Sequence, residues 1–214
     1  MVEFRMRVEK FFSEEEKTRI QQAITAAEEK TSGEIVPMLV NASARYTEIE
    51  LLGLVVGLSI GTLAAAIYAE PWGHDFVYLW PMIGAAAGFL VCRIPWVKRS
   101  LLPGRQRDAA VLQRSLAAFT AEGLHHTRDH TGILIFVSLL EHEVEVLADQ
   151  GINEKVPTGT WDEVVRILTA ELKAGRACEG FCKAIGRCGA ILAEHFPRAT
   201  DDRDELSNRL VTGQ

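Results

Sequence analysis

Two apolar runs in the middle of the chain constrain its fold more than any other feature. The first, residues 51–69, reads LLGLVVGLSIGTLAAAIYA and contains no charged residue. The second, residues 76–97, contains a single charge, Arg93, near its far end. A helix needs roughly 20 apolar residues to cross about 30 Å of hydrocarbon. Both runs reach that length and a short polar segment joins them, so the sequence predicts a transmembrane helical hairpin over residues 51–97.

The alternative is that both runs are core helices of a soluble protein. Burying two such helices on all sides would take most of the core that a chain of 214 residues can build. A signal peptide is excluded by position, because about fifty polar, helix-forming residues precede the first run. We therefore expect the lipid bilayer to be one partner of this chain.

Positive charges flank the two runs unequally. Five Lys or Arg residues lie at the end of the second run or in the flank that follows it. The flank just before the first run contains only Arg45, and the joining segment contains none. The five are Arg93, Lys98, Arg99, Arg105 and Arg107. Lys and Arg stay on the cytoplasmic side of a membrane. We therefore predict two spans in the inner (cytoplasmic) membrane, with both termini and the soluble domain in the cytoplasm.

Glycines recur at four-residue spacing in both runs. They are Gly53, Gly57 and Gly61 in the first run and Gly84 and Gly88 in the second. Small residues at this spacing let two helix backbones approach closely in lipid. The sequence therefore predicts that the two spans pack on each other.

The charge balance argues against nucleic-acid binding, and the cysteine spacing argues against a disulfide framework or a CxxC metal site. The chain carries 23 Lys and Arg against 29 Asp and Glu, and nucleic-acid binding needs clustered positive charge, so no nucleic acid is expected as a partner. Cys178, Cys182 and Cys188 lie in one helical stretch, where their spacing fits neither a disulfide framework nor a CxxC metal site. We interpret them as packed thiols in a reducing compartment.

Outside the runs, helical and strand patterns alternate. Helices are expected over 13–30, 106–126, 160–172 and 177–195, and strands over 34–40, 132–139 and 144–148. Capping boxes are expected at Ser13–Glu16 and at Thr160–Glu163. Pro37 places the first strand at an edge or makes it irregular there. The pattern predicts an α/β sandwich with a small mixed sheet flanked by helices and interrupted by the hairpin.

The expected domain boundaries follow from this order. Residues 10–45 and 105–197 would form one discontinuous soluble domain, residues 51–97 the hairpin, and residues 198–214 a charged, mobile tail.

Several of these segments resemble the TPM domain family. They are the opening Phe11-Phe12-Ser13, the step Thr31-Ser32-Gly33-Glu34-Ile35-Val36, and the strand–turn–strand block from Thr131 to Ile152. The resemblance implies an open α/β sandwich. It also implies kinship with a thylakoid lumen protein linked to photosystem II repair, for which weak acid phosphatase activity is reported. The chain departs from the family in placing its spans after the first strand, and in having Thr158 where members often have Asp.

Three carboxylates form the best candidate site. Glu34 opens the first strand, Asp149 ends the third, and Glu154 follows in the next loop. Carboxylates at strand ends often face a ligand crevice, and such oxygens suit Ca²⁺ or Mg²⁺. The alternative is that Asp149 caps a turn and the two glutamates are solvated. Trp161, just after this loop, is a candidate to line a pocket, or else packs partly buried.

The sequence leaves three functions open and contains no nucleophile with a partnered base. The first is a membrane-anchored cytoplasmic TPM-like domain that serves as an interaction, assembly or repair factor for a membrane complex, with a membrane protein partner and no catalysis. The second is a metal-assisted phosphatase using Glu34, Asp149 and Glu154. The third is a small transport subunit, which the absence of ionisable residues within the spans, apart from Arg93, disfavours.

Overall fold

A computed structural model shows the chain as two compact units. The structure describes residues 8, 10–72, 77–198 and 205–213. One unit combines residues 1–43 with 108–214, and the other comprises residues 44–107. The first unit is therefore discontinuous in sequence, with the second inserted after its first strand.

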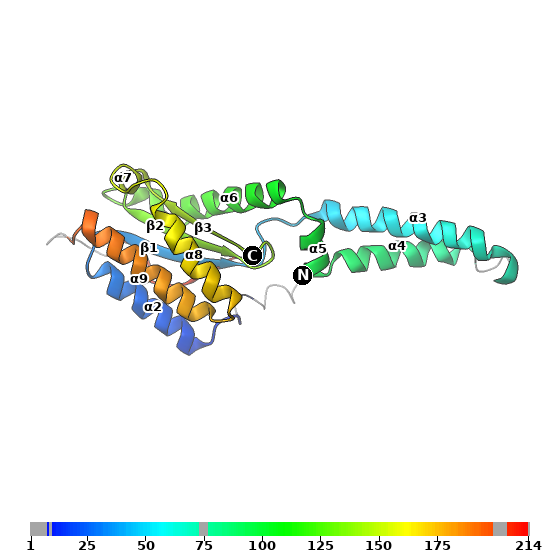
Figure 1. The fold of residues 1–214 in the computed structure, drawn as a ribbon, viewed down its shortest axis with the longest axis horizontal. Helices are drawn as coiled ribbons and strands as arrows, with labels where there is room; N and C mark the ends of the chain where they lie inside the picture. Colours follow the sequence, from blue (N-terminus) through cyan, green and yellow to red (C-terminus); the bar gives the residue numbers. More distant parts are fainter. Residues whose placement is uncertain (1–7, 9, 73–76, 199–204, 214) are drawn as a thin grey trace. The chain divides into compact units, whose positions relative to one another are not determined.

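The elements follow one another along the chain as labelled in Figure 1. Their bounds are α2 (Glu14–Glu28), β1 (Glu34–Val40), α3 (Thr47–Trp72), α4 (Leu79–Cys92), α5 (Pro95–Leu101), α6 (Gly104–Ala121), the 3-10 helix η2 (Leu124–His126), β2 (Gly132–Ser138), β3 (Glu143–Ala148), α7 (Gln150–Asn153), α8 (Thr160–Lys173), α9 (Ala177–His195) and β4 (Val211–Gly213).

A four-stranded mixed sheet, in the order β3-β2-β1-β4, forms the centre of the first unit. Strand β1 pairs in parallel with β2 and β4, and β2 pairs antiparallel with β3. Every residue of β1 and β2 is buried, because α2, α8 and α9 cover one face of the sheet and α6 covers the other (Figure 1). The α/β fold with a small mixed sheet flanked by helices was predicted correctly.

Each face of the sheet has its own core. Beneath α2, α8 and α9, the fully buried side chains include Ile20, Ile24, Ile133, Ile135, Phe181, Ile185 and Leu192. Beneath α6, the core comprises Val36, Met38, Val40, Val111, Ala118, Leu124, Leu134 and Phe136. Side chains alternate between the two faces along β1 and β2, which is why both strands read as continuous apolar runs.

Of the two expected capping boxes, one is present. The Ser13 Oγ accepts from the Glu16 amide at 3.2 Å, and the Glu16 Oε2 accepts from the Ser13 amide at 2.9 Å. The second prediction was wrong: Gly159 at φ +84° precedes α8, and the Thr160 hydroxyl donates to the Pro157 carbonyl at 2.7 Å. A left-handed glycine thus replaces the side-chain cap.

Pro37 lies in β1, which has a neighbour on each side. Its partner on β2 is Ile135, whereas the ladder to β4 begins one residue later, at Met38. Pro37 has no N–H to donate, so its position just before the second ladder leaves that ladder intact. Strand β1 is therefore a central strand for part of its length and an edge at Pro37.

The turn between β2 and β3 buries a carboxylate. Glu141 is fully buried, accepting from the Ser138 hydroxyl through one oxygen and from the Ser43 amide at 2.9 Å through the other. Glu141 ties the turn to the chain that leaves β1, while His142 adopts φ +56° to complete it.

The second unit contains the predicted hairpin helices, and they differ in length from the prediction. Helix α3 is long enough for a span: its segment Thr47–Ile67 has a mean hydropathy of 2.0. Helix α4 ends at Cys92, and α5 is bent by 87° from it, so the two qualify only as one broken span. The predicted continuous second helix over 76–97 was therefore wrong at its end. Residues 73–76 of the predicted connection lie outside the described residues.

Helices α3 and α4 meet along their glycines. A Cβ built on Gly57 would lie 2.8 Å from the carbonyl carbon of Gly84, and one built on Gly84 would lie 3.0 Å from Gly61 Cα. Gly53 faces the Gly88 carbonyl in the same way. The two backbones approach too closely for any side chain at these positions, as the four-residue spacing had predicted.

The C-terminal segment differs from the expected mobile tail. Residues 211–213 pair with β1, and Leu206 and Leu210 pack against the two cores. The residues between 198 and 205 lie outside the described ones. The described part of the predicted tail is thus a component of the sheet.

The four cysteines are free thiols. Burial raises the pKa of Cys188 to about 12 and, with the neighbouring Cys182, that of Cys178 to about 11. A raised pKa keeps these two thiols protonated and unreactive. Their geometry matches their interpretation as packing residues.

Candidate binding pocket and the predicted carboxylates

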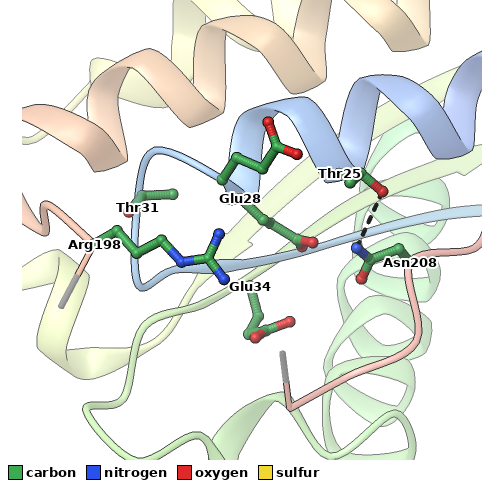
Figure 2. A pocket seen from close by; sticks show the side chains of 7 residues that line it. Thr25, Glu28, Thr31, Glu34, Arg198 and Asn208 are labelled. Atoms are coloured by element: carbon green, nitrogen blue, oxygen red, sulfur yellow. Dashed lines mark hydrogen bonds between the residues drawn. The ribbon is translucent and has the colours of Figure 1, made fainter. Parts of the chain in front are cut away.

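A polar pocket of about 210 Å³ lies where α2 ends, β1 begins and the C-terminal segment returns to the sheet. Figure 2 shows its side chains converging from these three segments. The lining residues are Thr25, Glu28, Glu29, Thr31, Glu34, Arg198 and Asn208. Arg198 and Asn208 lie more than 160 residues from the other five along the chain, so the complete pocket exists only in the folded domain.

Two carboxylates in the pocket are oriented by backbone amides. Glu28 Oε1 accepts from the Ile35 amide at 2.8 Å, and Glu34 Oε1 accepts from the Glu205 amide at 3.0 Å. Glu34 is only 7% exposed. A carboxylate is buried at this level only when hydrogen bonds compensate for lost water. The amide bonds therefore hold both side chains in defined positions on the pocket wall.

The turn before β1 fixes the opposite wall. The Thr31 hydroxyl donates to the Phe196 carbonyl at 2.6 Å and accepts from the Gly33 amide at 3.1 Å. Gly33 is required there, because a Cβ would meet Leu192 at 2.7 Å. These bonds tie the end of α9 to the turn and so place Arg198 at the pocket.

The pocket combines carboxylates with a guanidinium and an amide. Asn208 Nδ2 donates to the Thr25 hydroxyl at 3.3 Å and closes one side (Figure 2). A volume of 210 Å³ corresponds to about seven water molecules. Such a site suits a small polar molecule that carries a positive group for the glutamates or an anionic group for Arg198.

Asp149 and Glu154 have local structural roles. Asp149 caps α7, accepting from the Gln150 amide at 2.7 Å, and its other oxygen lies 3.1 Å from His130 Nδ1. Glu154 Oε1 accepts from the Gln150 side-chain amide at 2.8 Å. This is the turn-capping alternative that the sequence left open for Asp149.

The sheet register nevertheless places Glu34 and Asp149 at one end of the sheet. Glu34 lies opposite Gly132, and the Asp149 amide donates to the Gly132 carbonyl at 2.9 Å. The side chains of the two carboxylates bond to different segments, the C-terminal segment and His130. Within the described part of the chain, no group of three or more His, Cys, Asp or Glu is arranged to hold a metal ion. The predicted trio is therefore not gathered into one cation site.

Trp161 packs partly buried against the core beneath α2, α8 and α9. It does not line the polar pocket. Trp161 is therefore a packing residue, which is the second of the two roles that the sequence left open.

A second, shallower groove of about 600 Å³ lies between α8 and α9. Its floor is small and apolar, with Ile167, Ala170, Gly186 and Ala190, and its rim is charged, with Arg166, Glu171, Lys183 and Arg187. Lys183 Nζ lies 2.7 Å from Glu171, and hydrogen bonds from Lys183 and Arg176 lower the pKa of the Glu171 carboxyl. These ion pairs brace α8 against α9.

Sequence reasoning missed Arg198 and Asn208 as pocket residues. Asn208 meets Thr25 across 183 residues of chain. No sequence motif links these two residues. The charged residues that follow Pro197 are typical of a solvated tail, so the segment was not expected to line a pocket. A weak signal was present in the three large apolar residues of this segment, Leu206, Leu210 and Val211, which a fully solvated end would not need.

Comparison with known proteins agrees with this fold. Residues 99–191 match the model of the TPM domain family. The NMR structure of the BA42 protein from the psychrophilic bacterium Bizionia argentinensis is similar, with a TM-score of 0.61 and 23% identity over 95% of this chain and 96% of that one. At that identity the likeness shows the fold alone. None of the curated proteins matches the chain in sequence.

The matched residues begin within α5 and end within α9. Helix α2 and strand β1 lie outside them, yet β1 pairs with β2 over seven residues. The resemblance drawn from the sequence is confirmed, and the sheet includes the segment before the hairpin. Residues 99–191 therefore resemble the TPM domain family, within an α/β fold that also includes α2 and β1.

Proposed function

We propose that this protein is a membrane-anchored TPM domain, held by α3 and α4, that docks a membrane partner through its cytoplasmic domain. One observation supports the anchor: between residues 51 and 67 and between residues 79 and 92 the helices carry no charge, most of their exposed side chains are apolar, and they contact each other along glycines. Only 28% of the apolar window of α3 is buried. The core helix of a soluble protein would be mostly buried, so this surface needs a lipid environment.

The outward side chains are large and well exposed. Exposed fractions are 60% for Leu51, 62% for Ile60, 63% for Leu63, 68% for Met82 and 61% for Leu90. Monomeric soluble proteins rarely expose so much contiguous apolar surface. Glycine contacts between helices are the packing expected in lipid, where apolar burial gives no drive for association.

The anchor and its topology are tested together in intact spheroplasts. We expect the protein to remain in the membrane fraction after alkaline extraction. A membrane-impermeant maleimide should label Tyr78→Cys, just before α4, in intact spheroplasts, because the proposed topology places this end of α4 outside the cell. Lys173→Cys, on the domain, should be labelled only after permeabilisation. Extraction of the wild-type chain by alkali would refute the anchor, and the reverse labelling pattern would refute the topology.

The groove between α8 and α9 supports a docking role for the domain. Its apolar floor and charged rim are features of protein-binding surfaces, and a Cβ on Gly186 would meet nothing within 4 Å. Gly186→Leu therefore fills the groove without disturbing the fold. We expect a protein that co-purifies in gentle detergent with the wild type to be lost with this variant.

A matched control distinguishes blocking of the groove from a general effect of adding a leucine to the surface. Ala117→Leu places the same side chain at an exposed position of α6, away from the groove. It should retain the co-purifying protein. If both variants retain it, the partner does not dock in this groove. If the wild type co-purifies with no protein in a defined ratio, the docking role itself is refuted.

A further inference from the structure

Helix α5 forms a sharp elbow at the end of α4. The axes of the two helices differ by 87°. Ile94 is extended at ψ 125° and Pro95 opens α5, because a residue before proline avoids the helical region. A helix perpendicular to a membrane-spanning one lies along the membrane surface. Residues 93–105 are called the α5 elbow below.

The elbow is fixed to the start of α3. Lys98 Nζ lies 2.6 Å from Glu50 Oε1, and these side chains are only 12% and 21% exposed. The same amine donates to the Arg45 carbonyl at 3.3 Å. The ion pair therefore neutralises Lys98 and sets which face of α5 points outward.

Three large apolar side chains of the elbow are exposed, and one of them is a tryptophan. Trp96 is 70% exposed, Leu101 48% and Ile94 41%. Tryptophan is enriched where hydrocarbon meets headgroups, since its ring is apolar and its N–H remains hydrated. Apolar side chains on a short helix beside a span are typical of a segment seated in that interface.

Positive charge surrounds these apolar side chains, and the elbow itself contains no carboxylate. Residues 93–107 contain five Lys or Arg and no Asp or Glu. Within the described part of the chain, Arg99 and Arg105 form no ion pair, and the Arg93 guanidinium lies 5.7 Å from the centre of the Phe89 ring. Cations clustered next to a span attract anionic lipid headgroups.

We propose that the α5 elbow binds the headgroups of anionic phospholipids at the cytoplasmic surface, through Arg93, Arg99 and Arg105, with Trp96 seated among them. This proposal rests on the membrane insertion of α3 and α4 proposed above. One cation near an anionic surface enriches the charged lipid about fivefold. The elbow therefore selects a lipid environment in addition to anchoring the chain.

The test uses the full-length protein in nanodiscs, with Trp96 as the reporter. Trp72, Trp80 and Trp161 are replaced by Phe, and quenching of Trp96 is measured with phospholipids brominated near the headgroup. The bromine is carried either by phosphatidylglycerol or by phosphatidylcholine, at equal mole fractions of the two lipids. We expect brominated phosphatidylglycerol to quench about fivefold more effectively per mole. The ratio should fall to about one in the variant R93Q/R99Q/R105Q.

A control variant, K10Q/K30Q/K173Q, removes the same number of positive charges from exposed positions of the first unit. It should retain the wild-type ratio. Wild-type quenching that is equal for both lipids would overturn the proposal, as would an unchanged ratio in R93Q/R99Q/R105Q. Either result would leave the elbow as a surface for a protein partner.

A second reporter distinguishes failure of this proposal from failure of the anchor. In a chain that retains only Trp80, at the start of α4, quenching by either brominated lipid reads insertion alone. If Trp80 is quenched and Trp96 shows no preference, the anchor stands and lipid selection is refuted. If neither tryptophan is quenched, the chain is not inserted, and both proposals are refuted.

Discussion

At the scale of single residues, the β2–β3 region holds two glutamates in opposite electrostatic situations. Glu141 is fully buried, but the Ser138 hydroxyl and the Ser43 amide bond to its carboxylate. Glu145 is partly buried on β3, opposite Phe136, and its charge is disfavoured. Burial raises the pKa of the Glu145 carboxyl, and the nearby Glu143 raises it further. Hydrogen bonds thus compensate for the burial of the Glu141 carboxylate. At Glu145, burial and the neighbouring Glu143 both disfavour the charged form.

The variant Glu145→Gln should be more stable than the wild type at neutral pH. Because the folded pKa lies above the unfolded one, the wild type loses stability as pH rises through the folded value. The amide has no charge to bury, so the gap in Tm should be present at pH 7 and close below the unfolded pKa of about 4.3. Thermal unfolding of both proteins across that pH range measures it, with Glu194→Gln on the exposed side of α9 as the control. A difference in Tm between wild type and Glu145→Gln that is equal at every pH would contradict the raised pKa of Glu145.

Residue-level prediction from the sequence succeeded where partners are neighbours. The Ser13–Glu16 capping box closes over three residues, so its pattern is visible in the chain. The Glu141 carboxylate and Asn208 find partners that are 98 and 183 residues away. No local pattern encodes such partners, so the sequence alone does not predict either contact.

At the scale of elements, the hairpin depends on backbone contact between α3 and α4. Gly57 faces Gly84 and Gly88, and these glycines leave no space for a side chain. The spacing of small residues in the sequence was sufficient to predict this, because packing in lipid follows a simple periodicity. The end of α4 was mispredicted, since hydropathy alone continues through Pro95 while the backbone turns there.

Replacing Gly57 by Ile should separate the two helices. Overpacking of a close contact typically costs about 1–3 kcal/mol. We expect the free energy of unfolding in detergent to fall by about that amount, measured by circular dichroism against denaturant. Ser59→Ile, on the exposed side of α3, should be nearly neutral. Equal effects of the two substitutions would show that the glycine contact contributes nothing specific.

At the scale of the whole molecule, the C-terminal segment closes the sheet and the pocket. Strand β4 pairs with β1, and the Glu205 amide bonds to Glu34. The fold class and the order of most elements could be predicted, because helical and strand periodicities are local. The fourth strand could not, since three residues are too few for a pattern and its partner lies at the start of the chain.

Deleting residues 205–214 should destabilise the domain, although the sequence alone marks them as a tail. Leu206, Leu210 and Val211 each lose partial burial, on the order of 3 kcal/mol in total. The midpoint of urea unfolding in detergent should fall, and deletion of Gln214 alone should leave it unchanged. A truncated chain with the wild-type midpoint would show that β4 does not contribute to stability.

The parallel pairing of β1 with β2 has a consequence for biosynthesis. Strand β1 leaves the ribosome first, and about ninety residues of hairpin and helix must follow before β2 appears. At roughly 5–20 residues per second, that interval lasts about 5–20 s. During it, the seven side chains of β1 that are destined for the interior stay uncovered beside the apolar hairpin. Synthesis of this protein therefore includes a waiting period in which the nascent chain depends on protection from aggregation.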